Sequence, residues 1–140
     1  MDYETFATTA DVGIRAFGDD WASLYRNAVL GCGELIFGPQ PAAAGTSAAA
    51  SAAKRLRITG DSGENVLVKL LGEVMHLVYQ KRRCVVGLRV RHADERGLAA
   101  EILHAPWPQP PALEIKSVTY HDLKVREEAG RKRVDLLLDV

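Results

Sequence analysis

The chain has 140 residues, of which 47% are hydrophobic, so we expect one domain with its own core over residues 1–140. Its 18 Lys and Arg residues equal its 18 Asp and Glu residues, which argues against strong direct nucleic-acid binding and against an anionic membrane surface as partner. The chain has two cysteines and no CxxC motif, so we expect no disulfides. Its start lacks the form of a signal peptide, and its apolar runs are well short of the roughly 20 residues of a membrane span, so we expect a cytoplasmic protein.

The first part of the chain predicts a strand, a helix and a loop. Apolar residues alternate over residues 12–17, as in a strand. Gly18-Asp19-Asp20 predicts a turn followed by a helix N-cap, and helical apolar spacing then runs from Trp21 to an end at Gly38-Pro39. Residues 39–53 are rich in Ala, Ser, Gly and Pro, without periodicity or charge, which indicates a loop inside the domain.

The second part of the chain predicts one further helix and most of the strands. A turn that ends at Asn65, a candidate cap, leads into helical apolar spacing over residues 66–78. A hairpin turn is predicted at residues 127–131. The predicted strands lie at residues 56–58, 86–91, 98–104, 113–125 and 134–140. In total we expect about six strands in a mostly antiparallel sheet with two main helices packed on it. This is an α+β fold, because the late strands follow one another without helices between them.

Two aspartates are the first candidates for chemistry. Asp11 lies just before the first predicted strand, and Asp139 alternates with the inward apolar residues of the last one. If these strands are neighbours, the two carboxylates converge, and paired oxygens suit a hard cation such as Ca²⁺ or Mg²⁺. The terminal carboxylate at Val140 would add an oxygen. The alternative is that Asp11 caps a turn and Asp139 is a solvated charge.

Three separated segments carry a family resemblance, and they are Thr8-Thr9-Ala10-Asp11-Val12-Gly13-Ile14, Ile115-Lys116-Ser117-Val118-Thr119-Tyr120-His121-Asp122-Leu123 and Val134-Asp135-Leu136-Leu137-Leu138-Asp139-Val140. In this order, and in a chain of this length, they resemble the archease family. Members of that family assist the GTP-dependent ligase that joins RNA ends in tRNA splicing and repair. The resemblance covers nearly the whole chain, and its specificity comes from the combination of segments.

The resemblance implies a site and a role. Archeases bind a divalent cation, commonly assigned as calcium, and the matching ligands here are Asp11, Asp139 and Val140. The implied function is that of a non-catalytic accessory protein, which docks transiently on the tRNA-splicing RNA ligase and promotes its guanylylation and multiple turnover. A chaperone or modulator of a tRNA methyltransferase, or of another RNA-modifying enzyme, is the alternative. A small metal-dependent hydrolase is disfavoured, because two isolated carboxylates without an obvious general base are too few groups for catalysis.

The chain departs from the family pattern at two positions. Thr8 stands where many archeases have histidine, so the resemblance does not carry over the partner of the metal site at this position. Gly72-Glu73 stands where many have Asn-Glu; the glycine costs about 1 kcal/mol of helix propensity against alanine, which suggests close packing there. Lys116 and His121 lie in one of the family segments. They could contact phosphate or transfer a proton; the alternative is that they are an ordinary surface lysine and a half-buried histidine.

Basic residues and cysteines complete the candidates. Three basic clusters are interpreted as solvated faces, with a partner-docking or RNA-contacting patch as the lesser alternative: Lys81-Arg82-Arg83, Arg89 with Arg91, and Arg131-Lys132-Arg133. Cys32 falls on an apolar helix face and is expected in the core, whereas Cys84 is a candidate for an exposed thiol. The four histidines have no zinc-site spacing, and the chain has no phosphate-binding glycine motif.

Overall fold

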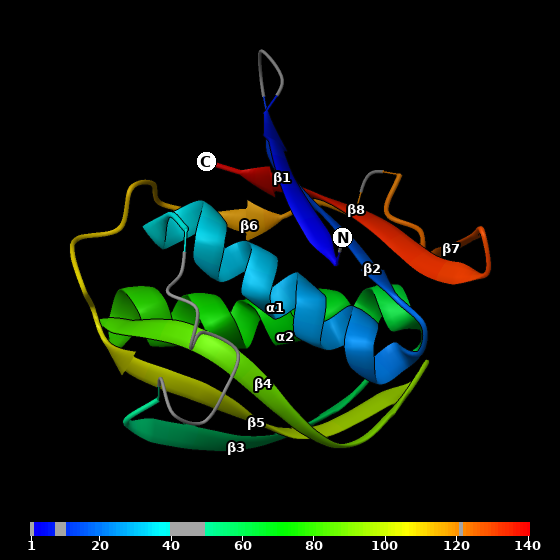
Figure 1. The fold of residues 1–140 in the computed structure, drawn as a ribbon, viewed down its shortest axis with the longest axis horizontal. Helices are drawn as coiled ribbons and strands as arrows, with labels where there is room; N and C mark the ends of the chain where they lie inside the picture. The colour runs from blue at the N-terminus through cyan, green and yellow to red at the C-terminus, as the bar shows by residue number, and fades with distance from the viewer. Residues whose placement is uncertain (1, 8–10, 40–49, 121) are drawn as a thin grey trace.

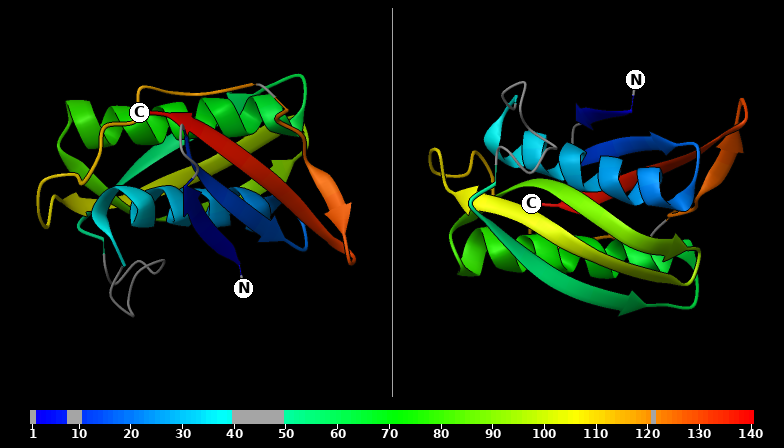
Figure 2. Two further views of the ribbon diagram at one scale, coloured as in Figure 1. Left: turned by 90° about the horizontal axis from the view of Figure 1, so that it is seen from above. Right: turned by 60° about the horizontal axis from the view of Figure 1, so that its bottom comes forward.

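The computed structural model describes residues 2–7, 11–39, 50–120 and 122–140. Two helices lie in a layer between two antiparallel sheets (Figure 1), and the turned views of Figure 2 show the same layering. The α+β class, the antiparallel pairing and the two main helices are therefore confirmed. Within the described residues the strands number eight, and they are divided between two sheets, one on each side of the helices.

The first sheet has the order β1-β2-β8-β6, and β7 pairs with a further part of β8. Its members are β1 (Tyr3–Ala7), β2 (Val12–Gly18), β6 (Ser117–Val118), β7 (Arg126–Glu128) and β8 (Arg131–Asp139). The strands predicted at residues 12–17 and 134–140 are β2 and β8, and they are neighbours, as the metal hypothesis requires. The extended segment predicted at residues 113–125 contributes only the two residues of β6 to a strand.

The second sheet has the order β3-β5-β4 and lies on the far side of the helices. It consists of β3 (Ala52–Thr59), β4 (Arg83–Asp94) and β5 (Gly97–Pro106). These strands are longer than predicted at residues 56–58, 86–91 and 98–104. The loop predicted at residues 39–53 overlaps the first residues of β3, and its residues 40–49 lie outside the described part of the chain.

Helix α1 (Trp21–Phe37) begins and ends at the predicted residues. The Asp20 carboxylate accepts the Ser23 N–H at 2.8 Å, which satisfies one of the unpaired donors of the first turn. Gly38 has φ of 83°, in the left-handed region that glycine adopts at low cost, and it ends the helix. Glycine is therefore required at this helix end.

Helix α2 (Gly63–Met75) starts earlier than predicted. Ser62, and not Asn65, is its N-cap, because the Ser62 hydroxyl accepts the Asn65 N–H at 3.2 Å. The helix continues into a π-helical turn, η2 (His76–Gln80), which covers the rest of the predicted segment.

One apolar core joins both sheets to both helices. Its largest fully buried side chains include Tyr25, Ile14, Leu24, Ile36, Leu67, Leu70, Ile102 and Leu136. The Tyr25 hydroxyl donates to the Asp94 carbonyl at 2.6 Å and so fastens α1 to β4. Asn27, a buried polar residue, donates to the Phe17 carbonyl at 2.7 Å. None of the described helices has the length and apolar character that a membrane span needs.

Candidate functional site

The candidate metal ligands lie at one end of the first sheet. Val12 of β2 pairs with Leu138 of β8, and the next residues outward on the two antiparallel strands are Asp11 and Asp139. Opposed residues of an antiparallel pair have Cβ atoms about 4.5–5.5 Å apart, a spacing at which two carboxylates can share one ion. The pairing of β2 with β8 thus places the two aspartates, 128 positions apart in the sequence, at the same end of neighbouring strands.

Strand β6 fixes the other side of this end. Ser117 pairs with Asp139, and the Lys116 N–H donates to the Asp139 carbonyl at 2.7 Å. This bond engages the main-chain oxygen of Asp139, while the alternation of β8 turns its side chain away from the buried Leu138. Val140 is 47% exposed. Asp139 is therefore held by backbone bonding while its carboxylate faces outward.

The donor set at this end fits a hard cation. Two carboxylates and main-chain oxygens are the ligands that Ca²⁺ and Mg²⁺ prefer, and both ions accept water in the remaining positions. No group of three or more His, Cys, Asp and Glu side chains suited to a metal occurs among the residues that the structure describes. Side chains of this region thus offer two ligands, and the other positions would fall to main-chain oxygens, water or a partner.

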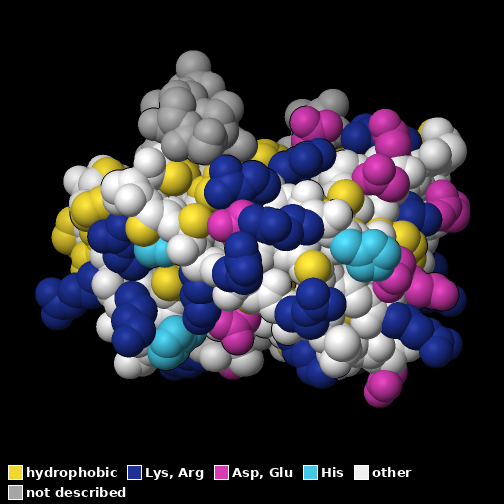
Figure 3. All heavy atoms as spheres, turned by 90° about the horizontal axis from the view of Figure 1, so that it is seen from below, with side chains coloured by type: hydrophobic (Ala, Val, Ile, Leu, Met, Phe, Trp, Pro, Cys, Tyr) yellow, Lys and Arg dark blue, Asp and Glu magenta, His cyan; other side chains and the backbone are white. Residues whose placement is uncertain are grey.

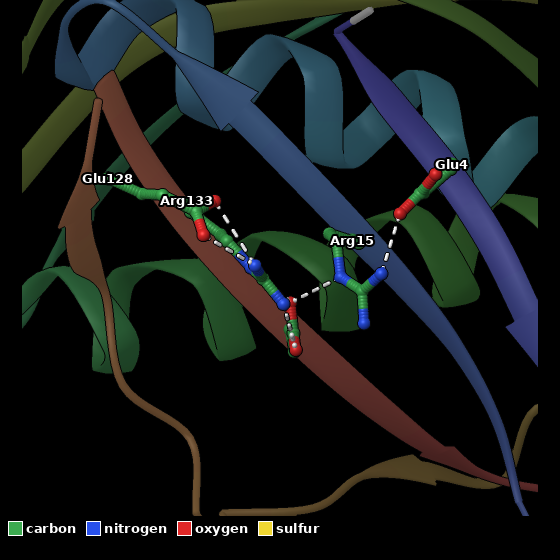
Figure 4. A network of polar contacts seen from close by, with 5 residues as sticks. Glu4, Arg15, Glu128 and Arg133 are labelled. Carbon is green, nitrogen blue, oxygen red and sulfur yellow. Dashed lines mark hydrogen bonds and ion pairs between the residues drawn. The ribbon is translucent and has the colours of Figure 1, made fainter. Parts of the chain in front are cut away.

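A chain of ion pairs crosses the outer face of the same sheet (Figure 4). Arg15 donates to Glu4 at 2.6 Å and to Asp135 at 3.1 Å, so it joins all three strands β1, β2 and β8. Arg133 donates two bonds to the Asp135 carboxylate, each at 3.2 Å, and two to Glu128 of β7 at 2.9 and 3.1 Å. The network ties four strands together on the side that no helix covers.

The charges of this network are mutually compensated. Burial of Asp135 disfavours its ionised form, but the hydrogen bonds from Arg133 and Arg15 outweigh that effect and hold the pKa of the carboxyl below its ordinary value. The network borders a hollow of about 600 Å³ that extends to Lys124 and Arg126. Because its carboxylate already binds two arginines, Asp135 is poorly suited to hold a cation.

The other residues of the family segment have structural contacts. Lys116 is exposed beside Asp139. Tyr120 is 58% exposed, and its hydroxyl accepts a bond from Asn65 at 3.1 Å near the start of α2. The predictions for Thr8 and His121 fall outside the described residues.

Two expectations at single residues are wrong. A Cβ at Gly72 would have no atom beyond its own part of the helix within 4 Å, so close packing does not explain this glycine. Cys84, the candidate for an exposed thiol, is 2% exposed, and burial raises its pKa. Cys32 lies in the core as expected, and burial raises its pKa to about 12. Both cysteines are thus poor nucleophiles, since the thiolate is the reactive form.

Comparison with known proteins decides the family. The model of the Archease protein family matches residues 3–140, almost the whole chain. This chain belongs to the archease family. It is similar to curated proteins named "Protein archease", with 24% identity to that of Methanosarcina mazei over 99% of this chain and 95% of the relative, and 25% identity to that of Pyrococcus furiosus over 99% and 98%.

Solved structures support the archease fold. The solution structure of Methanobacterium thermoautotrophicum protein 1598 has a TM-score of 0.70 at 22% identity and covers 99% of this chain and 98% of its own. The crystal structure of an archease from Thermotoga maritima, described as a possible chaperone, has a TM-score of 0.60 at 15% identity and covers 98% of this chain and 96% of its own. At these identities the comparison establishes the fold.

The sequence reasoning missed the ion-pair network because it missed β1. Tyr3, Thr5 and Phe6 are residues that favour strands, and they give a weak signal over five positions. Without β1 there is no partner for Arg15 on its outer side. The sequence pattern therefore did not predict the ion pair between Glu4 and Arg15.

Proposed function

We propose that this archease is a non-catalytic activator of a GTP-dependent tRNA-splicing RNA ligase and promotes the ligase's guanylylation and multiple turnover. The observation that carries the proposal is the adjacency of Asp11 and Asp139 at the end of β2 and β8. Asp11, Asp139 and Val140 would hold a divalent cation, Ca²⁺ or Mg²⁺. When bound, such a cation supplies positive charge that neutralises and orients phosphate oxygens, among them those of GTP.

The residues around this end support a docking role. Hydrogen bonds from Lys116 and Thr119 to the carbonyls of Asp139 and Leu137 hold β8 in place, at 2.7 and 3.0 Å. Asp139 and Val140 are exposed, so they can reach a partner protein. Because the described side chains supply few ligands, a ligase that contributed oxygens of its own would tighten the cation site on docking.

The test is multiple-turnover RNA ligation by the matching ligase with GTP and Ca²⁺ or Mg²⁺, with this protein present at sub-stoichiometric amounts. We expect turnover to rise with the wild-type protein and to rise much less with Asp11→Asn or Asp139→Asn. Asp61→Asn is the matched control, since Asp61 is exposed near the start of α2. A ligase that ignores the wild-type protein would refute the proposal, and full stimulation by both site variants would refute the role of the cation.

A second candidate is a chaperone or modulator of a tRNA methyltransferase or another RNA-modifying enzyme. The description of the Thermotoga maritima archease as a possible chaperone supports it. The two candidates differ in the partner. Affinity capture from the source cell, with Asp139→Asn as the matched bait, should recover the ligase in the first case and a methyltransferase in the second.

A further inference from the structure

Four arginines gather on the outer face of the second sheet. Arg55 of β3 pairs with Glu101 of β5, and Glu101 pairs with Arg89 of β4, so the three side chains share one face. Arg57 lies two residues after Arg55 and therefore on the same face. Arg91 reaches the same glutamate through its guanidinium at 3.0 Å. We call these five residues the arginine face; it carries four positive charges and one negative charge.

The arginines of this face are open to solvent. The side chains of Arg89 and Arg91 are 51% and 57% exposed, although both bond Glu101, whose side chain is only 14% exposed. Hydrogen bonds from these two arginines hold the pKa of Glu101 below its ordinary value, so it is ionised at neutral pH. Arg55 and Arg57 are exposed and have no ion pair in the described part of the chain.

The contrast with another basic cluster is informative. Arg131, Lys132 and Arg133 each form ion pairs with one or more carboxylates. The charge of that cluster is therefore locally neutralised. The arginine face keeps its excess charge, and Figure 3, which looks onto this side, shows Lys and Arg side chains around an isolated acidic group. A protein of zero net charge thus carries a positive face on the described part of this sheet.

We propose that the arginine face binds the phosphate backbone of double-stranded RNA. Guanidinium groups match phosphate oxygens with paired donors, and here they stand on a sheet rather than in a cleft. The exposed large hydrophobic residues of the described chain are Tyr120 and Val140, and neither belongs to this sheet. The face therefore offers no stacking platform of the kind that single-stranded RNA binders use, which favours a duplex.

The choice of RNA over DNA rests on the proposed function, whereas the phosphate chemistry does not. The binding is weak and sensitive to salt, because the protein as a whole is neutral and Glu101 competes for two of the four arginines. With about three phosphates neutralised, the logarithm of the binding constant should fall with the logarithm of salt concentration with a slope of about −2 to −3. The role of the face would be to hold duplex regions of tRNA while the opposite sheet meets the ligase.

The test is fluorescence anisotropy of a labelled 20-base-pair RNA duplex titrated with the full chain at low salt. The double variant Arg55→Glu/Arg57→Glu should lower affinity about tenfold or more. Lys124→Glu/Arg126→Glu is the matched control: it also replaces two exposed cations two residues apart with anions, but it lies beside the other sheet. The control should change affinity less than about threefold, and Glu101→Gln, which frees two arginines, should tighten binding.

Several outcomes would overturn the proposal. If both double variants lost the same affinity for the duplex, binding would depend on the net charge of the protein and not on the arginine face. A duplex that does not bind at low salt, together with a polyglutamate peptide that binds the wild type and not Arg55→Glu/Arg57→Glu, would assign the face to an acidic protein partner. Duplex DNA that binds as well as RNA would remove the assignment to RNA.

The ligation assay separates this proposal from the proposed function. RNA binding without any stimulation of the ligase would leave the face standing and refute the activator role. Stimulation of the ligase by a protein that does not bind the duplex would support the activator role and refute RNA binding by the arginine face. If both hold, Arg55→Glu/Arg57→Glu should weaken stimulation at low salt more than at high salt, where salt already screens the contact, whereas Asp139→Asn should weaken it at both.

Discussion

Replacing Gly72 by alanine should make the protein more stable. Gly72 lies inside α2, which continues through η2 to Gln80, so it does not sit at a fraying end. It is not among the glycines with positive φ, and a Cβ there meets no atom beyond its own part of the helix within 4 Å. Neither strain nor overpacking therefore opposes the substitution. The helix propensity gain of about 0.8–1.0 kcal/mol should appear almost undiminished.

The expected size of the effect follows from the chain length. Unfolding entropy is about 2.1 cal/mol/K per residue, or about 0.3 kcal/mol/K for this chain, so Gly72→Ala should raise Tm by about 3 °C. Thermal and urea unfolding followed by circular dichroism measure it. Gly63→Ala is the matched control in the same helix: its Cβ would collide with the Trp21 ring, and it should destabilise by about 1–3 kcal/mol.

An unchanged or lower Tm for Gly72→Ala would refute this reasoning. It would mean that α2 has a constraint at this position that its packing does not reveal. If stability rises while ligase stimulation falls, the open space beside Gly72 is used for contact with a partner. The family resemblance leads us to expect Asn-Glu at this position, so the experiment tests whether the departure from that pattern concerns folding or docking.

Three further results are expected. Asp20→Ala should destabilise by about 1 kcal/mol in urea unfolding, because the α1 cap is lost, and Asp20→Ser should recover most of it. Asp135→Asn should cost about 1 kcal/mol at pH 7, discounted because the side chain is 40% exposed. Since the folded pKa of Asp135 is lowered, this difference should be full above its ordinary pKa, near 4, and vanish as pH falls through the folded pKa; a constant difference down to pH 2 would contradict it. Calcium at about 100 times its Kd should stabilise the wild type by about 2.7 kcal/mol and Asp139→Asn much less, with chelator reversing the effect, and equal stabilisation of both would refute the site.

Much of this fold follows from local patterns. The apolar spacing of α1, its cap at Asp20 and its stop at Gly38 are all local, and the structure agrees with each. The alternation over β2 and β8 predicted both strands and turned Asp139 away from the core. These elements are predictable because the signal lies within about ten consecutive residues.

The parts that sequence reasoning missed depend on contacts between distant residues. The division of strands between two sheets depends on which face of α1 meets which strand, and a list of elements does not contain that information. Cys84 gave no sign of burial, because its position at the start of β4 depends on pairing with Ala105. The arginine face needs the register of β3, β5 and β4, although the repeats Arg55-x-Arg57 and Arg89-x-Arg91 are visible in the chain.

The central place of β8 has a consequence for folding. Its pairing with β2 joins residues 120 positions apart at Arg15 and Asp135, whereas β4 and β5 form a tight hairpin at Asp94 and Gly97. Long-range pairings carry the larger loop-closure cost and tend to form late. The part of the arginine face on β4 and β5 can therefore assemble early, but Asp11 and Asp139 meet only once β8 has docked. A bound cation would favour the docked strand, so amide hydrogen exchange of β8 should slow with calcium while that of β4 and β5 stays the same.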